Sequence, residues 1–448
     1  MSGIKGRDMT QGSIWKQLVL FSMPILLAHL LQQTYNAFDA IIVGRFVSNE
    51  ALAAVGSSGP ITMMVIAFFM GMSSGSSVLI AQFFGAKNTG ELHNTVHTAI
   101  LLAIIIGVAL SFAGILFTPA LLRLVQTPPE VLAEAVIYLR IYFGGLTGIT
   151  VYNMGAAILT ATGDSKRPLY FLLFASVVKI VLNLVFVIGL HMGVASVAWS
   201  TVIAQALCAV MVVALLCRQD SDIRLDLRKL RIHKHILKKI LKIGLPGGIQ
   251  GAIISFSNVV AQSYINRLGG AAMAGYGIGT RIDAFIIMPM QSMAIAVSTF
   301  VGQNLGGGKV KRAREGARAA IITAIGCVVI FGAIVLTFAS NLLRIFTPDE
   351  QIIAYGLEFM RVFVPLYFLL CLNQVISGAL RGAGDVKIPT IIGISCLVIM
   401  RQLYLFIATQ ISLTVTVVAF AFPVGWFLAA VFLTIYYIRR DWSGFEKK

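Results

Sequence analysis

Residues 81–87 (AQFFGAK) return as residues 302–309 (GQNLGGGK), and Gln82 is repeated by Gln303, 221 residues further on. Three more pairs recur in the same order: LLRL 121–124 with LLRI 342–345, TPPE 127–130 with TPDE 347–350, and GDSKRP 163–168 with GDVKIP 384–389. A sequence that contains one apolar unit twice predicts two packed lobes with a seam between them. In membrane proteins built from such repeats, the substrate path follows this seam.

The composition indicates that lipid rather than water surrounds most of the chain. Hydrophobic residues make up 58% of the sequence and charged residues 12%, and the mean hydropathy is +0.88. Soluble domains carry about 25% charged residues, a proportion that this chain does not approach. About twelve apolar runs are long enough to cross a hydrocarbon layer as helices. They lie near 14–43, 52–82, 94–117, 131–160, 168–190, 194–217, 235–266, 273–302, 315–338, 351–380, 388–410 and 414–438. We predict an all-α integral membrane protein with twelve transmembrane helices.

The basic residues are distributed unequally over the two sides of this topology. Of the 35 Lys and Arg residues, 26 fall on the side of both termini and five within the predicted helices. The opposite side holds four: Arg45, Arg123, Arg267 and Arg344. This asymmetry follows the positive-inside rule and predicts that both termini are cytoplasmic. We interpret the net charge of +17 as topology determinants and phospholipid contacts, and we expect no nucleic-acid partner.

Several classes of protein find no support in the sequence. There is no Walker A motif, and no soluble stretch is large enough for a nucleotide-binding domain. The five cysteines lie in or at the end of predicted helices without a CxxC pair, so we expect neither disulfides nor a metal site. No combination of nucleophile and base suggests an enzyme. We therefore expect no cofactor, and an ion gradient or an external partner as the energy source.

The most polar stretch, residues 218–242, separates the two repeats. We assign residues 1–217 to an N-terminal lobe of six helices, 218–235 to a basic cytoplasmic linker, and 236–448 to a C-terminal lobe of six helices. The linker is interpreted as a solvated segment in contact with lipid headgroups. A regulatory binding site is the alternative interpretation.

Four stretches carry a family resemblance: YNAFDAIIVGRFV at 35–47, ATGD at 161–164, GIGTRI at 277–282 and LRGAGD at 380–385. In this order and at the repeat spacing, they resemble the multidrug and toxic compound extrusion (MATE) family of the multidrug/oligosaccharidyl-lipid/polysaccharide (MOP) exporter superfamily. The resemblance covers essentially the whole chain. It implies twelve helices in two six-helix lobes that form a V-shaped central cleft. It also implies an antiporter that expels amphipathic organic cations in exchange for protons or sodium ions. We expect a monomer in the plasma or inner membrane of a prokaryotic cell.

Asp39 is the only carboxylate of the first predicted helix. Tyr35 and Asn36 precede it by four and three residues, which predicts one shared helical face. An apolar surrounding disfavours the charged form of a carboxylate, so protons could load on Asp39 and leave it. The resemblance also implies that Asp39 is the cation-coupling carboxylate of the N-terminal lobe. The alternative is a structural ion pair that never titrates.

Lys179 makes that alternative serious, because a lysine in the middle of a membrane helix needs a partner. The resemblance implies Asn at position 179 and Asp at position 183, where this chain has Lys179 and Asn183. We expect Lys179 to take the position of a bound sodium ion and to pair with Asp39. Snorkelling of Lys179 to an interface is the alternative. Asn153 and Thr201 match polar positions that line the same cavity in the family, or they form helix–helix hydrogen bonds.

The C-terminal lobe lacks the acids that sodium-coupled relatives carry in their seventh and tenth helices. The corresponding stretches, around Ser255 and Asn373, contain neither Asp nor Glu, which argues against a sodium site there. Arg281 and Asp283 point about 200° apart on a helix and need separate partners. We expect Arg401 to be the partner of one of them. The role of these three residues is interpreted as mainly structural, within the cavity of that lobe.

Methionines are frequent on the second and eighth predicted helices, and they include Met63, Met64 and Met288. Flexible, polarizable methionines suit promiscuous binding surfaces, so we assign these residues to the substrate path. Ordinary packing or lipid contact is an equal alternative.

The function that best accounts for these features is secondary active multidrug efflux by alternating access. A flippase for lipid-linked or polysaccharide precursors, from the same superfamily, is the alternative. Such a flippase would need a strongly cationic central cavity for a pyrophosphate headgroup, and five scattered cations within the helices support it weakly. A channel or receptor would need neither duplicated lobes nor a lone titratable acid.

Overall fold

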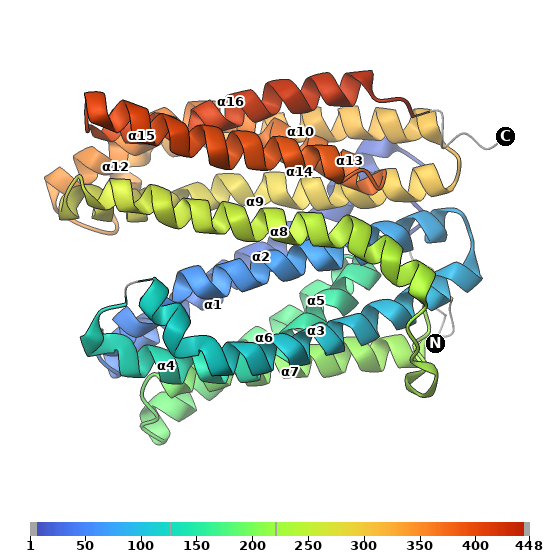
Figure 1. Ribbon diagram of the computed structural model, residues 1–448, viewed down its shortest axis with the longest axis horizontal. Helices are drawn as coiled ribbons and strands as arrows, with labels where there is room; N and C mark the ends of the chain where they lie inside the picture. The colour runs from blue at the N-terminus through green and yellow to red at the C-terminus, as the bar shows by residue number, and fades with distance from the viewer. Residues whose placement is uncertain (1–6, 126, 220–221, 443–448) are drawn as a thin grey trace. The chain divides into compact units, whose positions relative to one another are not determined.

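The computed structural model describes residues 7–125, 127–219 and 222–442, and this part of the chain contains helices but no strand (Figure 1). The first repeat contains α1 (Ile14–Phe46), α2 (Asn49–Gly85), α3 (Thr89–Leu124), α4 (Pro129–Gly144), α5 (Leu146–Ala161), α6 (Lys166–Leu184), η1 (Val185–Gly189) and α7 (Ala195–Arg218). The second contains α8 (Lys234–Asn266), α9 (Gly270–Gly306), α10 (Val310–Thr337), α11 (Ala339–Arg344), α12 (Glu350–Phe363), η3 (Val364–Leu366), α13 (Tyr367–Gly382), α14 (Lys387–Ile394), η4 (Ser395–Met400), α15 (Arg401–Ile411) and α16 (Val415–Arg439). The turn η2 (Leu227–Lys229) lies between them. The all-α class is confirmed.

Eleven helical stretches of the described residues are long and apolar enough to cross a membrane. The pair α4–α5 makes a twelfth if it is counted as one span, and it bends by 48° at Gly145. A Cβ atom on Gly145 would lie 2.3 Å from Cγ2 of Val202 on α7, so the bend depends on glycine. With this pair counted as one, the twelve predicted transmembrane helices are confirmed.

Two predicted helices of the second repeat are interrupted. The run 351–380 consists of α12, the 3-10 turn η3 and α13, and Pro365 lies in η3. Proline removes a backbone donor and clashes with the preceding turn, which accounts for the break. The run 388–410 consists of α14, the π-helical segment η4 and α15. π-Helical segments of this kind bend membrane helices and are frequent near functional side chains.

The duplication seen in the sequence extends to individual backbone turns. Lys87 and Gly308, 221 residues apart, end α2 and α9 with φ values of 56° and 74°. Gly163 and Gly384 occupy matching turns after α5 and α13, with φ values of 92° and 75°. In all four turns the following residue donates its N–H to the carbonyl five residues back, at 2.8–3.0 Å. This is the Schellman pattern of helix ends, and only Lys87 adopts it without glycine.

The helices form two compact units. The first unit contains residues up to Asp8 and Leu27–Gly248, and its core includes Leu122, Leu139 and Leu146. The second contains Met9–Leu26 and Ile249–Lys448, and its core includes Phe300 and Phe359. Relative to the predicted lobes at 1–217 and 236–448, the beginnings of α1 and α8 are assigned to the unit of the other repeat.

Glycines allow a close helix crossing in the first unit. A Cβ atom on Gly71 of α2 would lie 2.1 Å from the backbone nitrogen of Gly248 on α8. On Gly75, one turn later, it would lie 2.6 Å from the carbonyl oxygen of Ile240. Only glycine permits such an approach of two backbones, as in other small-residue contacts of membrane helices.

The described linker residues dock on α3 of the first unit. Asp226 donates its backbone N–H to Nε2 of His97 at 3.1 Å, and His97 is 1% exposed. The backbone N–H of His233 donates to Oγ1 of Thr98 at 3.2 Å. His235 lies 3.1 Å from a carboxylate oxygen of Glu91. The segment is therefore fixed to the protein by its own hydrogen bonds.

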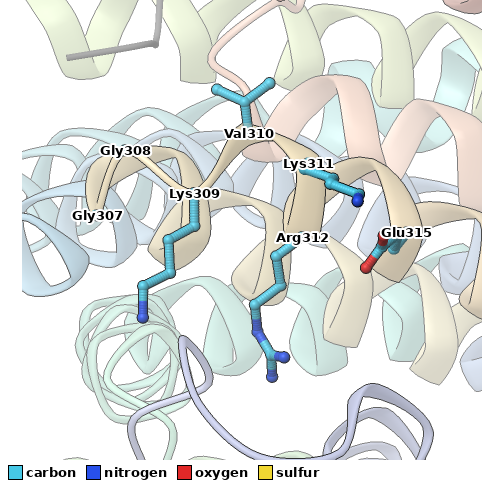
Figure 2. A pocket seen from close by; sticks show the side chains of 7 residues that line it. All are labelled: Gly307, Gly308, Lys309, Val310, Lys311, Arg312 and Glu315. Atoms are coloured by element: carbon cyan, nitrogen blue, oxygen red, sulfur yellow. The ribbon is translucent and has the colours of Figure 1, made fainter.

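In the second unit, residues 9–11 dock in a comparable way beside the start of α10. Met9 donates its N–H to Oε1 of Gln303 at 2.9 Å and is fully buried. Lys309 donates to the carbonyl of Thr10 at 2.8 Å, and Arg312 donates to that of Gln11 at 2.9 Å. Figure 2 shows both side chains in the shallow pocket formed by residues 307–312 and 315. These two cations thus fix backbone carbonyls of the N-terminal segment.

Candidate coupling and binding residues

Asp39 of α1 and Lys179 of α6 form a buried ion pair in the first unit. Nζ of Lys179 donates to Oδ2 of Asp39 at 2.6 Å, and the two side chains are 5% and 13% exposed. Asn183, one turn beyond Lys179, donates its Nδ2 to Oδ1 of Asp39 at 3.1 Å. The predicted contact between Asp39 and Lys179 is therefore present, and Asn183 belongs to the same cluster.

The aromatic ring of Tyr35 completes the surroundings of the lysine. Nζ of Lys179 lies 4.1 Å from the ring centroid of Tyr35, within the range of a cation–π contact. Asn36 is exposed and lies 3.5 Å from Oε1 of Gln33, so the structure does not bring it to the carboxylate. The helical geometry explains the difference, because positions i−4 and i−3 lie on opposite sides of Asp39 by about 40° and 60°.

The sequence analysis did not identify Gln205 of α7, which lies beside the pair. Together with Tyr35, Ser176 and Lys179 it lines a small void. Its Oε1 atom is buried without a hydrogen-bond partner among the described residues. The signal was its spacing, because Gln205 lies one turn after Thr201 on the same helix.

Asn153 and Thr201 do not reach the ion pair through any hydrogen bond of the described residues. Nδ2 of Asn153 donates to the carbonyl of Ile149 at 2.8 Å, and Oγ1 of Thr201 donates to that of Val197 at 2.7 Å. Both bonds return to the residue's own helix, and both side chains are partly buried. Neither residue makes the helix–helix bond that was the alternative interpretation.

In the second unit, the expected pairing of Arg401 with Asp283 or Arg281 is wrong. Asp283 of α9 is 2% exposed and accepts a hydrogen bond from the Tyr367 hydroxyl at 2.6 Å. Arg401 instead donates to Asn258 and Ser257 of α8. Because Asp283 and Arg401 reach different helices, each finds a neutral partner. Arg281 is exposed, as its position on the other side of α9 predicts.

The methionines of the expected substrate path have different environments. Met63 is 62% exposed and Met64 is partly buried, both on α2. Met288 on α9 is only 6% exposed, so it packs inside the second unit and presents no open surface. Packing therefore accounts for Met288, whereas Met63 remains available for contact with lipid or a ligand.

Comparison with known proteins gives the class of this membrane protein. The MatE family model matches residues 24–185 and 246–407, one match in each repeat. The chain therefore belongs to the MATE family of transporters, within the MOP exporter superfamily.

Two relatives come from Bacillus subtilis (strain 168). "Probable multidrug resistance protein YoeA" is 31% identical over 391 residues, which cover 85% of this chain and 84% of that protein. "Probable multidrug resistance protein YpnP" is 29% identical over 381 residues and covers 85% of both chains. A solved structure of a multidrug resistance MATE transporter in an outward-facing conformation superimposes with a TM-score of 0.91, at 25% identity and with both chains fully covered.

Proposed function

We propose that this chain is a secondary active multidrug exporter that exchanges amphipathic, mostly cationic organic compounds for protons. The names of its relatives support multidrug transport. The single observation that carries the coupling assignment is the 2.6 Å ion pair between Asp39 and Lys179. We further infer a monomer in the plasma or inner membrane of a prokaryote, with both termini cytoplasmic, in contact with phospholipids and without a nucleic-acid partner.

A proton can act on this pair without a bound metal or cofactor. When Asp39 is ionised, its charge cancels that of Lys179, and Asn183 holds the second oxygen. Protonation of Asp39 removes the attraction and leaves a buried ammonium without a counter-ion, which is costly in a low dielectric. The protein therefore gains free energy by moving to a conformation in which Lys179 finds water or another partner. Proton binding would thus favour one conformation of an alternating-access cycle.

Sodium coupling is the competing assignment. A sodium site needs several oxygen ligands, usually with more than one carboxylate. Here the lysine nitrogen lies at the Asp39 carboxylate, and Asn183 supplies an amide. The described residues contain no group of three His, Cys, Asp or Glu side chains arranged for a metal ion. These observations support protons as the coupling ion.

The flippase alternative receives less support. A pyrophosphate headgroup would call for several buried cations in one place. Among the described residues, Lys179 and Arg401 are the buried Lys and Arg side chains, one in each unit, and Lys179 is already paired. This arrangement favours a binding site for compounds with at most one acidic group.

The proposal is tested by dye efflux from proteoliposomes under proton and sodium gradients that are imposed separately. We expect efflux with the proton gradient alone, and none for Asp39→Asn. Efflux that requires sodium at a fixed proton gradient would assign the coupling to sodium. Efflux by Asp39→Asn at the wild-type rate would remove Asp39 from the mechanism.

A further inference from the structure

Arg401 is a buried cation that the proposed coupling step does not use. It begins α15, is 4% exposed and forms no ion pair with any described carboxylate. Its Nη1 donates to Oδ1 of Asn258 at 2.8 Å, and its Nη2 donates to Oγ of Ser257. The Nε atom is buried and has no hydrogen-bond partner among the described residues. The second unit therefore holds an uncancelled positive charge.

Donors exceed acceptors around this guanidinium. Arginine has five N–H donors and no acceptor. Gln402 adds a further donor, because its Nε2 donates to Oγ of Ser257 at 2.7 Å and to the backbone carbonyl of Ser257 at 2.9 Å. Two side chains thus converge on one hydroxyl, and a neutral oxygen does not cancel a charge. A carboxylate would supply two oxygens in the geometry that a guanidinium fork matches.

The surroundings indicate how such a group would reach Arg401 and what it would carry. Asn258 is exposed on α8. An exposed amide on a membrane helix indicates a surface reached by water, because lipid would leave its N–H groups unpaired. The guanidinium carbon lies 5.0 Å from the ring centroid of Phe422, which packs against Phe363 and Trp426. A charged fork beside an aromatic cluster suits a flat aromatic compound with an acidic group.

We propose that Arg401, together with Ser257 and Asn258, binds the carboxylate of amphipathic aromatic substrates. This inference rests on the proposed export function and narrows its substrate class. The compounds exported best carry an acidic group in addition to any amine, so they are zwitterions rather than simple cations. The ester of such a compound lacks the charge that Arg401 recognises, although it retains the same aromatic body.

The test compares rhodamine B, which has a free carboxylate, with its methyl ester. Binding of each dye to the full chain in detergent is followed by fluorescence polarisation. We expect Arg401→Gln to weaken binding of the acid by roughly tenfold or more and binding of the ester by less than about twofold. Arg361→Gln, which changes an exposed arginine of α12, is the matched control and should alter neither affinity. Equal losses for both dyes, or no loss for the acid, would overturn the proposal.

A second variant keeps the test informative if Arg401→Gln does not fold. Asn258→Asp is nearly isosteric and puts a carboxylate at the atom that already accepts from Nη1. This internal counter-ion should raise the melting temperature and remove the preference for the acid. Unchanged binding of rhodamine B by Asn258→Asp would contradict the assignment. Stronger competition from short-chain phosphatidic acid than from benzoate would replace the carboxylate with a lipid phosphate.

Transport of the ester separates this proposal from the proposed function. If wild-type proteoliposomes export the ester on a proton gradient while Arg401→Gln loses export of the acid alone, both proposals stand. If wild type exports neither dye, the export function fails, although the binding preference is still measured independently. If wild type and Arg401→Gln export the acid and ester in the same ratio, only the Arg401 proposal fails.

Discussion

Lys179 and Asn183, one helical turn apart on α6, each hold a different oxygen of Asp39, at 2.6 Å and 3.1 Å. The lysine supplies the compensating charge, and the asparagine supplies a neutral donor. This division of roles means that the two contacts respond differently to a proton. Protonation of the carboxyl removes the charge attraction to Lys179, whereas Asn183 can still donate to the carbonyl oxygen.

The first prediction concerns the stability of the pair. Asp39→Asn leaves a buried ammonium without its counter-ion, and Lys179→Met leaves a buried carboxylate without its own. Breaking one partner of a buried pair typically costs ~3–5 kcal/mol, whereas replacing both is often nearly neutral. We expect each single variant to lower the melting temperature in detergent and the double variant to recover much of the loss. Losses that simply add in this double-mutant cycle would show that the pair has no coupling energy.

The second prediction concerns the choice of ion. Lys179→Asn combined with Asn183→Asp restores the residues that the family resemblance implies at these positions. The cluster then has two carboxylates and no lysine, and a hard cation with oxygen ligands is the simplest way to cancel the charge. Efflux by the double variant should depend on sodium at a fixed proton gradient. Lys179→Asn alone, with one carboxylate, is the control, and an unaltered sodium response of the double variant would refute the expectation.

The third prediction concerns the close crossing of α2 and α8. Gly71→Ala puts a methyl group 2.1 Å from the backbone nitrogen of Gly248, so the two helices must separate. Overpacking of this kind typically costs ~1–3 kcal/mol. Gly56→Ala on the same helix meets nothing within 4 Å and should be neutral or stabilising by ~0.5–1 kcal/mol. Thermal unfolding in detergent measures both, and equal melting temperatures would show that the crossing tolerates a side chain.

The fourth prediction concerns acid sensitivity of the linker. The backbone N–H of Arg228 donates to Oδ1 of Asp226 at 3.0 Å and lowers the pKa of Asp226 from 3.8, aided by the charge of Lys229. A depressed pKa stabilises the folded turn above the ordinary pKa, and this stabilisation is lost as the pH falls through the folded pKa. Cleavage of the linker by pepsin should therefore rise as the pH falls below 3.8. Asp226→Ala should be cleaved readily throughout and lack this dependence; the same pH profile in both proteins would exclude Asp226.

The fold was predictable because its determinants are local and repeated. A long apolar run forces a helix in lipid, and the 221-residue repeat fixed matching ends such as Lys87 and Gly308. The Asp39–Lys179 pair was predictable because two opposite charges in one apolar lobe must meet. The partners of Arg401 were not, because Ser257 and Asn258 are neutral and nothing in their spacing distinguishes them from ordinary helix residues. Likewise, the role of Gly145 in the α4–α5 bend depends on Val202, which is distant in sequence.

The assignment of Met9–Leu26 to the second unit has a consequence for biosynthesis. Leu18 and Phe21 belong to the same core as Phe300, so the earliest segment to leave the ribosome completes a unit whose other residues are made last. Until α9 has been inserted, this segment has no permanent neighbours and depends on lipid or insertion machinery. A gene divided at the linker would yield a second half without these core side chains. Such a fragment should be degraded or aggregate unless the first 26 residues are supplied with it.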